Sequence, residues 1–182
     1  MLSGKKLNQI CTQRRISESE LAEHVARGGT SAADAVGAIR NWRRGLYKPI
    51  PTRQDVEHLA EGLGVEVNDI SEWRACYRYA PMSARKARLI TGLIDGRDVQ
   101  DALDVLTFTH KRAAEAFKKV LHSAIANAEE QEADKDELVV VEARVDQAGR
   151  RMGTKAWRAK DRGRAHPIRK EASHIHVTVA EL

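Results

Sequence analysis

The chain has 182 residues, 31% of them charged and only 4% aromatic, and a formal net charge of +5. This length allows one ordinary domain or two small ones, whose mainly aliphatic cores would be marginally stable alone. No segment approaches the roughly 20 apolar residues that cross a bilayer, and residues 1–9 lack the apolar run of a signal peptide, so a cytoplasmic location is expected.

Residues 1–73 predict a domain of short helices separated by turns. Ser17 and Glu20 have the spacing of a capping box, which begins a helix that Gly28 and Gly29 should end. A second helix is expected over 31–44. Its inner face consists of Ala35, Ala38, Ile39 and Trp42.

A third helix is expected after the turn marked by Pro49 and Pro51, with Thr52 as its N-cap. Its apolar stripe consists of Val56, Leu59, Ala60 and Leu63. A last short helix is expected over 67–73, with Asn68 as its cap.

The order of these elements resembles the helix-turn-helix domain of phage repressors. The matching residues are Leu21-Ala22, Trp42-Arg43-Arg44-Gly45, Pro51, Leu59-Ala60 and Leu63-Gly64-Val65. The stretch between Leu21 and Trp42 is longer than that family usually has, which would displace the second motif helix. The nucleic-acid contacts that the resemblance implies are Arg40, Asn41, Arg43 and Arg44.

The candidate recognition helix consists mostly of Ala, Gly and Val, which offer few groups that pair with base edges. Residues 1–80 carry 12 basic and 10 acidic side chains, a weak positive charge for a free-standing DNA-binding domain. We therefore favour a helical extension that packs against, or contacts, an RNA or protein surface.

Residues 74–182 combine strand and helix patterns. A short strand is expected over 77–79, and Ser83 is the expected N-cap of the next helix. The apolar positions of that helix are Ala87, Ile90, Leu93 and Ile94. After a turn at Asp95 and Gly96, a second helix is expected. Its apolar positions are Val99, Ala102, Leu103 and Leu106.

Thr109 is the expected cap of a long helix that runs to Glu130. Its apolar positions are Ala113, Ala114, Phe117, Val120, Leu121, Ala124, Ile125 and Ala128. The pattern then changes to strands over 138–145 and 173–179. In the second of these, one face carries Ile175, Val177 and Val179, and the other carries His174, His176 and Thr178.

Positive charge is concentrated between these two strands. Nine basic residues and one acidic residue, Asp161, lie between Gln147 and Lys170, whereas the rest of the chain has 22 basic and 25 acidic residues. The nine are Arg150, Arg151, Lys155, Arg158, Lys160, Arg162, Arg164, Arg169 and Lys170. Such asymmetry indicates a polyanionic partner, either nucleic acid or an anionic membrane surface.

Short motifs follow one another in a specific order over 75–182. They are Met82-Ser83, Arg85-Lys86-Ala87-Arg88-Leu89, Leu93-Ile94-Asp95-Gly96, Ala102-Leu103, Lys119-Val120-Leu121, Ser123-Ala124-Ile125-Ala126-Asn127-Ala128-Glu129, Val145-Asp146, Arg162-Gly163-Arg164-Ala165 and Ser173-His174-Ile175. In this order they resemble the family of the twenty-second protein of the large ribosomal subunit. The chain departs from the family pattern in the basic segment between the two strands. There Gln147-Ala148-Gly149 replaces an acidic-Gly-Pro step, extra residues precede Lys155, and Asp161 interrupts the basic run.

The resemblance implies an α+β domain in which three helices pack on a small antiparallel sheet that extends into a long hairpin over 138–179. It implies binding to large-subunit ribosomal RNA, a hairpin that lines the nascent-peptide exit tunnel, and contacts with neighbouring ribosomal proteins and the nascent peptide. Besides the nine basic hairpin residues, the expected RNA contacts are Arg85, Lys86, Arg88, Lys118, Lys119 and Trp157.

The composition of the hairpin supports the same interpretation. Between Gln147 and Gly163 the larger apolar side chains are Met152 and Trp157 alone, too few to offset about 1–2 kcal/mol of entropy for each ordered residue. We therefore expect this segment to be disordered by itself and ordered when its arginines bind phosphates. Trp157 is expected either to stack on a base or to pack across the hairpin.

The alternative function is a DNA-binding transcriptional regulator acting through residues 1–73, and a protein that also represses its own operon would combine both functions. An enzyme has no support, because no phosphate-binding loop, nucleophile elbow or catalytic carboxylate pair is present. No cofactor or metal is expected, since His174 and His176 have no third ligand nearby. Cys11 and Cys76 are expected to be reduced.

Overall fold

The computed structural model describes residues 1–25 and 31–181, which form two compact units. The first unit contains residues 1–72 together with Glu181, and the second contains residues 73–180. Each unit has its own apolar core. The helix end expected at Gly28 and Gly29 lies outside the described residues.

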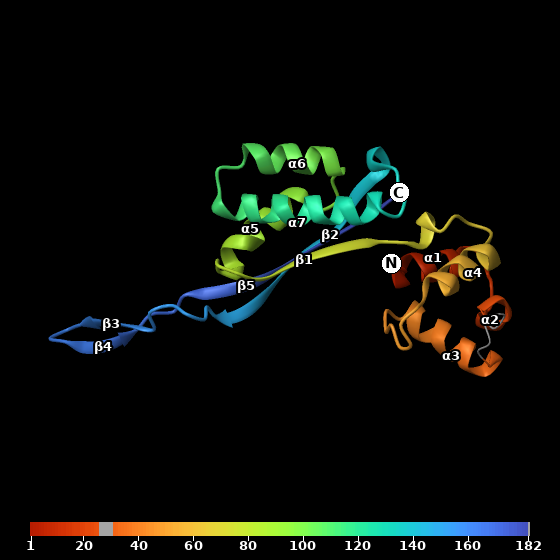
Figure 1. Cartoon of the computed structure of the whole chain (residues 1–182), viewed down its shortest axis with the longest axis horizontal. Helices are drawn as coiled ribbons and strands as arrows, with labels where there is room; N and C mark the ends of the chain where they lie inside the picture. Colours follow the sequence, from red (N-terminus) through yellow and green to blue (C-terminus); the bar gives the residue numbers. More distant parts are fainter. Residues whose placement is uncertain (26–30, 182) are drawn as a thin grey trace. The chain divides into compact units, whose positions relative to one another are not determined.

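The first unit is helical (Figure 1). Its α-helices are α1 (Gly4–Arg14), α2 (Glu18–Val25), α3 (Ala32–Arg43) and α4 (Arg53–Leu63), and a short 3₁₀ helix, η2 (Asn68–Ile70), follows them. No specific pattern in the sequence had indicated α1. α2 and α4 begin directly after their predicted caps, and α3 begins one residue after the start expected for it.

Two side-chain caps confirm the sequence predictions. At α2 the Glu20 N–H donates to Ser17 Oγ at 3.3 Å, and the Ser17 N–H donates to the Glu20 carboxylate at 2.8 Å. At α4 the Asp55 N–H donates to Thr52 Oγ1 at 3.3 Å, and the Thr52 N–H donates to the Asp55 carboxylate at 2.8 Å. Both pairs satisfy backbone donors that a helix start leaves free, so the local sequence determines where these helices begin.

Replacing Thr52 with alanine should lower the free energy of unfolding of the first unit by about 1 kcal/mol, because the Asp55 N–H loses its acceptor. Hydrogen exchange of the α4 amides in the full chain measures this change. Thr12→Ala is the matched control, since the exposed Thr12 hydroxyl donates to the Asn8 carbonyl and caps no helix start. An equal effect of both substitutions would contradict the assigned role of Thr52.

The expected inner faces of α3 and α4 are buried, as predicted. The indole N–H of Trp42 also donates to the Pro49 carbonyl at 2.6 Å, which holds the following loop against α3. The prediction of a helix over 67–73 is wrong beyond Ile70. Ser71 forms a β-bridge with Leu2, and the Glu72 N–H donates to the Met1 carbonyl, so the backbone there is extended. Asn68 lies inside η2 and makes no side-chain cap.

The second unit has three α-helices, α5 (Ala84–Ile94), α6 (Val99–Phe108) and α7 (Arg112–Glu129). Leu93, expected on the inner face of α5, is 37% exposed because it flanks the stripe that buries Ile90 and Ile94. Thr109 does not cap α7. Its hydroxyl donates to the Val105 carbonyl at 2.6 Å and so closes α6, and α7 begins after Lys111.

The helices pack on a three-stranded sheet of order β1-β5-β2 (Figure 1). The strands are β1 (Trp73–Ala80), β2 (Leu138–Arg150) and β5 (Glu171–Glu181), and all three extend beyond the predicted segments. β1 is antiparallel to β5, with Trp73 opposite Val179. The inner face of β5 is buried as expected and meets the apolar side of α7, whose predicted core positions are all buried. The unit is therefore α+β.

Beyond β2 and β5 the chain continues as a ribbon, which we call the basic ribbon (residues 151–170). It contains the antiparallel pair β3 (Trp157–Lys160) and β4 (Arg164–Pro167). The backbone N–H groups of Arg151 and Ile168 donate to the carbonyls of Lys170 and Ala156, both at 2.8 Å, so the arms are also paired away from β3 and β4. The turn at residues 161–163 has positive φ angles of 48°, 59° and 86°.

Candidate nucleic-acid interface

The basic side chains from Arg150 to Lys170 are all exposed. Every residue of β3 is exposed and so are most residues of β4, so the basic ribbon has no core of its own. Lys160 lies directly opposite Arg164, and like charges in such a cross-strand pair repel each other. The ribbon therefore presents cations outward in a conformation that bound anions would stabilise.

The acidic residue of the ribbon neutralises none of its arginines. The Asp161 carboxylate instead lies 2.8 Å from Nε2 of His166, which sits on the other side of the turn. Asp161 thus contributes to the turn, and the basic run remains available to a ligand.

Arg150 has a different position from the other hairpin cations. Its guanidinium donates to the carbonyls of Ala156 and Ile168, each at 3.2 Å. These two carbonyls belong to opposite arms of the ribbon, so Arg150 ties the arms together. Its loss should affect the shape of the ribbon as well as its charge.

Trp157 is 53% exposed and lies opposite Pro167. The Lys155 ammonium lies 5.7 Å from the centroid of its ring, within the range of a cation–π interaction. The indole therefore has a local cationic partner and an accessible surface. Both predicted roles, base stacking and packing across the hairpin, remain predictions.

The candidates on the helices fall into two groups. Arg88 donates to the Val145 carbonyl at 3.3 Å and Lys118 donates to Thr107 Oγ1 at 3.0 Å, so both side chains have partners within the unit. Arg85, Lys86 and Lys119 are exposed. Of these, Lys86 lies beside the root of the hairpin, together with Arg151, Arg169 and Lys170.

Sequence reasoning missed two cations at that root, Lys111 and Arg112. They occupy the N-cap and first position of α7. There they line a surface hollow that Lys86 also lines. The adjacent pair of basic residues at the start of a long amphipathic helix is the signal that identifies them.

In the first unit, three of the four candidate contacts have partners. The guanidinium groups of Arg40 and Arg43 lie 3.0 and 3.3 Å from the Glu18 carboxylate, which joins α3 to α2. The Asn41 amide donates to the Lys48 carbonyl at 2.8 Å. These groups would have to exchange an existing contact for a phosphate or a base. Arg44, the fourth candidate, is exposed.

The sheet histidines have local roles. The Tyr79 N–H donates to His174 Nδ1 at 3.1 Å, and the two rings meet edge to face. Burial lowers the pKa of His176 below its usual value, Arg144 adds to this effect, and Asp146 opposes it. Within residues 1–25 and 31–181 no group of three or more potential ligands could hold a metal ion. Both Cys11 and Cys76 are free thiols.

An α+β body that carries an exposed ribbon of cations is typical of a protein that binds a polyanion. Among the helices that the structure describes, none is long and apolar enough to cross a bilayer. The family model described as ribosomal protein L22p/L17e matches residues 75–180. This is more than half of the chain, which therefore belongs to that family of large-subunit ribosomal proteins.

The match begins within β1 and ends within β5, so it contains most of the sheet, the three helices and the whole basic ribbon. The family resemblance expected for residues 75–182 is confirmed. The match does not extend to residues 1–73, and their likeness to a helix-turn-helix domain remains a prediction.

Proposed function

We propose that this ribosomal protein binds large-subunit ribosomal RNA and lines the nascent-peptide exit tunnel with its basic ribbon, supporting subunit assembly and translation. The observation that carries the proposal is a ribbon of exposed cations with no core and no acidic neighbour to neutralise its arginines. Such a ribbon becomes ordered when it binds an anionic surface, and folded RNA supplies such a surface.

The candidate RNA contacts remain those predicted from the sequence, and the cations of the ribbon are proposed to contribute more than those on the body. The cations of the ribbon are proposed to bind phosphates, since an arginine fork grips a phosphate through two hydrogen bonds. Lys86, Arg85 and Lys119 on the body are proposed to add contacts beside it. The turn at residues 161–163 is proposed to face the nascent peptide, and the rest of the body to contact neighbouring ribosomal proteins.

We also propose that the first unit is a helical extension that docks on RNA or protein at the ribosome. The ion pairs from Arg40 and Arg43 to Glu18 support this assignment, because they engage cations that a DNA-reading helix would present to phosphates. Residues 1–73 would then extend the ribosomal domain and work in the same compartment, the cytoplasm.

The amides of the basic ribbon should exchange rapidly with deuterium in the free protein and slowly in the complex with large-subunit ribosomal RNA. The reason is that the ribbon has paired backbone groups but buries almost no apolar surface. Hydrogen exchange followed by mass spectrometry on the full chain measures both states. The α7 amides, which lie over a buried core in both states, are the internal control.

Strong protection of residues 151–170 without nucleic acid would contradict the proposed coupling between folding and binding. A full chain that fails to bind the RNA would contradict the proposed function itself.

A further inference from the structure

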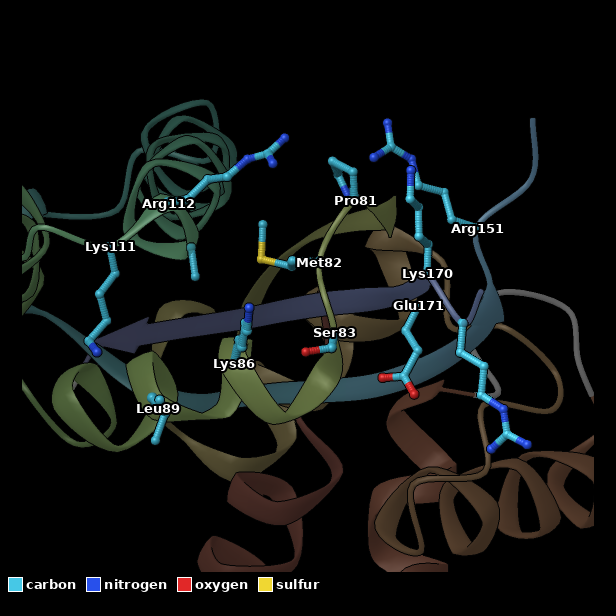
Figure 2. Close-up of a pocket in the computed structure, with 12 residues that line it drawn as sticks. Pro81, Met82, Ser83, Lys86, Leu89, Lys111, Arg112, Arg151, Lys170 and Glu171 are labelled. Carbon is cyan, nitrogen blue, oxygen red and sulfur yellow. The ribbon is translucent and has the colours of Figure 1, made fainter. Parts of the chain in front are cut away.

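A hollow of about 830 Å³ lies at the root of the hairpin, and we call it the root hollow. Figure 2 shows side chains from α5, the start of α7 and the base of the ribbon around Met82. Its six cationic side chains are Lys86, Lys111, Arg112, Arg151, Arg169 and Lys170. Pro81, Met82, Ser83, Leu89, Ala113 and Glu171 complete its lining.

The cations come from four segments that are separated in the sequence and are brought together by the fold. In the described part of the chain no ion pair joins any of the six to a carboxylate, and Glu171 shares the hollow without pairing with them. Like charges around one concave site repel one another and focus a positive potential inside it. An anion in the hollow would relieve that repulsion.

The helix starts at the hollow favour the same kind of ligand. Ser83 and Lys111, the N-caps of α5 and α7, make no side-chain hydrogen bond to the first turn, whereas Ser31 and Thr52 do so at α3 and α4. The positive ends of two helices of 11 and 18 residues therefore lie at the hollow that the cations line.

The apolar part of the lining indicates that the ligand is more than a phosphate. Met82 and Leu89 contribute to the wall, and Leu89 is 59% exposed although it lies on a helix with an apolar stripe. The volume falls within the range of about 300–1,000 Å³ that is typical of small-molecule sites. An unpaired nucleotide combines the flat aromatic face of a base, which can lie on apolar side chains, with a charged phosphate, and so matches both parts of this lining.

We propose that the root hollow binds an unpaired nucleotide of large-subunit ribosomal RNA, with its base against Met82 and Leu89 and its flanking phosphates on the surrounding cations. This inference rests on the proposed function and adds a defined docking site on the body. The nucleotide would fix the base of the ribbon, since Arg151 and Lys170 are joined there by a backbone hydrogen bond.

The test measures the affinity of the full chain for purified large-subunit ribosomal RNA over a range of salt concentrations. The double variant Lys86→Ala/Arg112→Ala should bind more weakly, and the slope of log affinity against log salt should fall by about 1.4, as two lost contacts to single-stranded phosphates require. Leu89→Asn should weaken binding a few-fold and leave the slope unchanged, because it removes apolar contact and no charge.

The matched control is Arg97→Ala/Lys135→Ala, which removes two exposed cations of the second unit outside the root hollow and should change neither affinity nor slope appreciably. Ultraviolet crosslinking of the RNA complex, read by mass spectrometry, should attach a nucleotide to the peptide that contains Met82 and Leu89. Circular dichroism of each variant confirms that the fold is intact.

Pocket variants that bind like the control would overturn the root hollow as a site. A weakened Lys86/Arg112 variant beside an unaffected Leu89 variant would overturn the base contact, and a crosslink from this peptide to a protein in assembled subunits would identify a protein ligand instead. These failures differ from failure of the proposed function, in which the unmodified chain does not bind the RNA.

Discussion

Replacing Arg158, Arg162 and Arg164 together with alanine should weaken the binding of the full chain to large-subunit ribosomal RNA on the order of 100-fold, since each charge-assisted hydrogen bond contributes roughly 1 kcal/mol or more. All three side chains are exposed on the basic ribbon, and none of them pairs with a carboxylate in the described residues. The slope of log affinity against log salt should fall by about 2, because three phosphate contacts release fewer counterions. Filter binding at several salt concentrations measures both quantities.

The control for this prediction replaces the same three residues with lysine. Lysine keeps the charge and loses the planar fork, so the salt slope should be retained while the affinity falls less than in the alanine variant. An alanine variant whose salt slope equals that of the unmodified chain would mean that the ribbon is not the main electrostatic contact. The contacts would then have to lie on the body or in the first unit.

Elements with strong local signals could be predicted from the sequence. The capping boxes at Ser17 and Thr52 place the starts of α2 and α4 because both partners of each hydrogen bond lie within four residues. The apolar stripe of α7 repeats over 18 residues, long enough for its buried face to be identified without knowledge of its partners.

Elements decided by distant contacts could not be predicted in this way. Residues 71–73 follow a helix-like pattern, but Ser71 pairs with Leu2, and Trp73 pairs with Val179 in the sheet. Thr109 has the composition of an N-cap, yet its hydroxyl closes the preceding helix. In each case a local preference worth about 1 kcal/mol or less is outweighed by pairing or packing.

The candidate site likewise has one part that the sequence predicts and another part that depends on the fold. The cations of the basic ribbon form one run in the sequence, so composition alone identifies them. The root hollow depends on the fold, because it joins Lys86 to Arg112 and to Lys170 across three separate segments. The ion pairs of Arg40 and Arg43 with Glu18 also depend on the fold, because they form only where α3 packs against α2.

Replacing Phe117 with alanine should lower the free energy of unfolding of the second unit by about 3–5 kcal/mol, since it leaves a cavity in a close-packed core. The Phe117 side chain is fully buried, with 0% exposure, where α7 meets the sheet. Small domains have little stability to lose, so a large share of these molecules should unfold under ordinary conditions. Urea denaturation followed by circular dichroism measures the change.

Phe108→Ala is the matched control, because Phe108 is 80% exposed at the end of α6 and its truncation should change stability by less than about 0.5 kcal/mol. The two variants should also differ in RNA binding, since the body anchors the strands from which the basic ribbon extends. If the Phe117 variant were strongly destabilised yet bound ribosomal RNA with full affinity and full salt dependence, the ribbon would act as an independent peptide. The body would then contribute neither the root of the hairpin nor a docking site of its own.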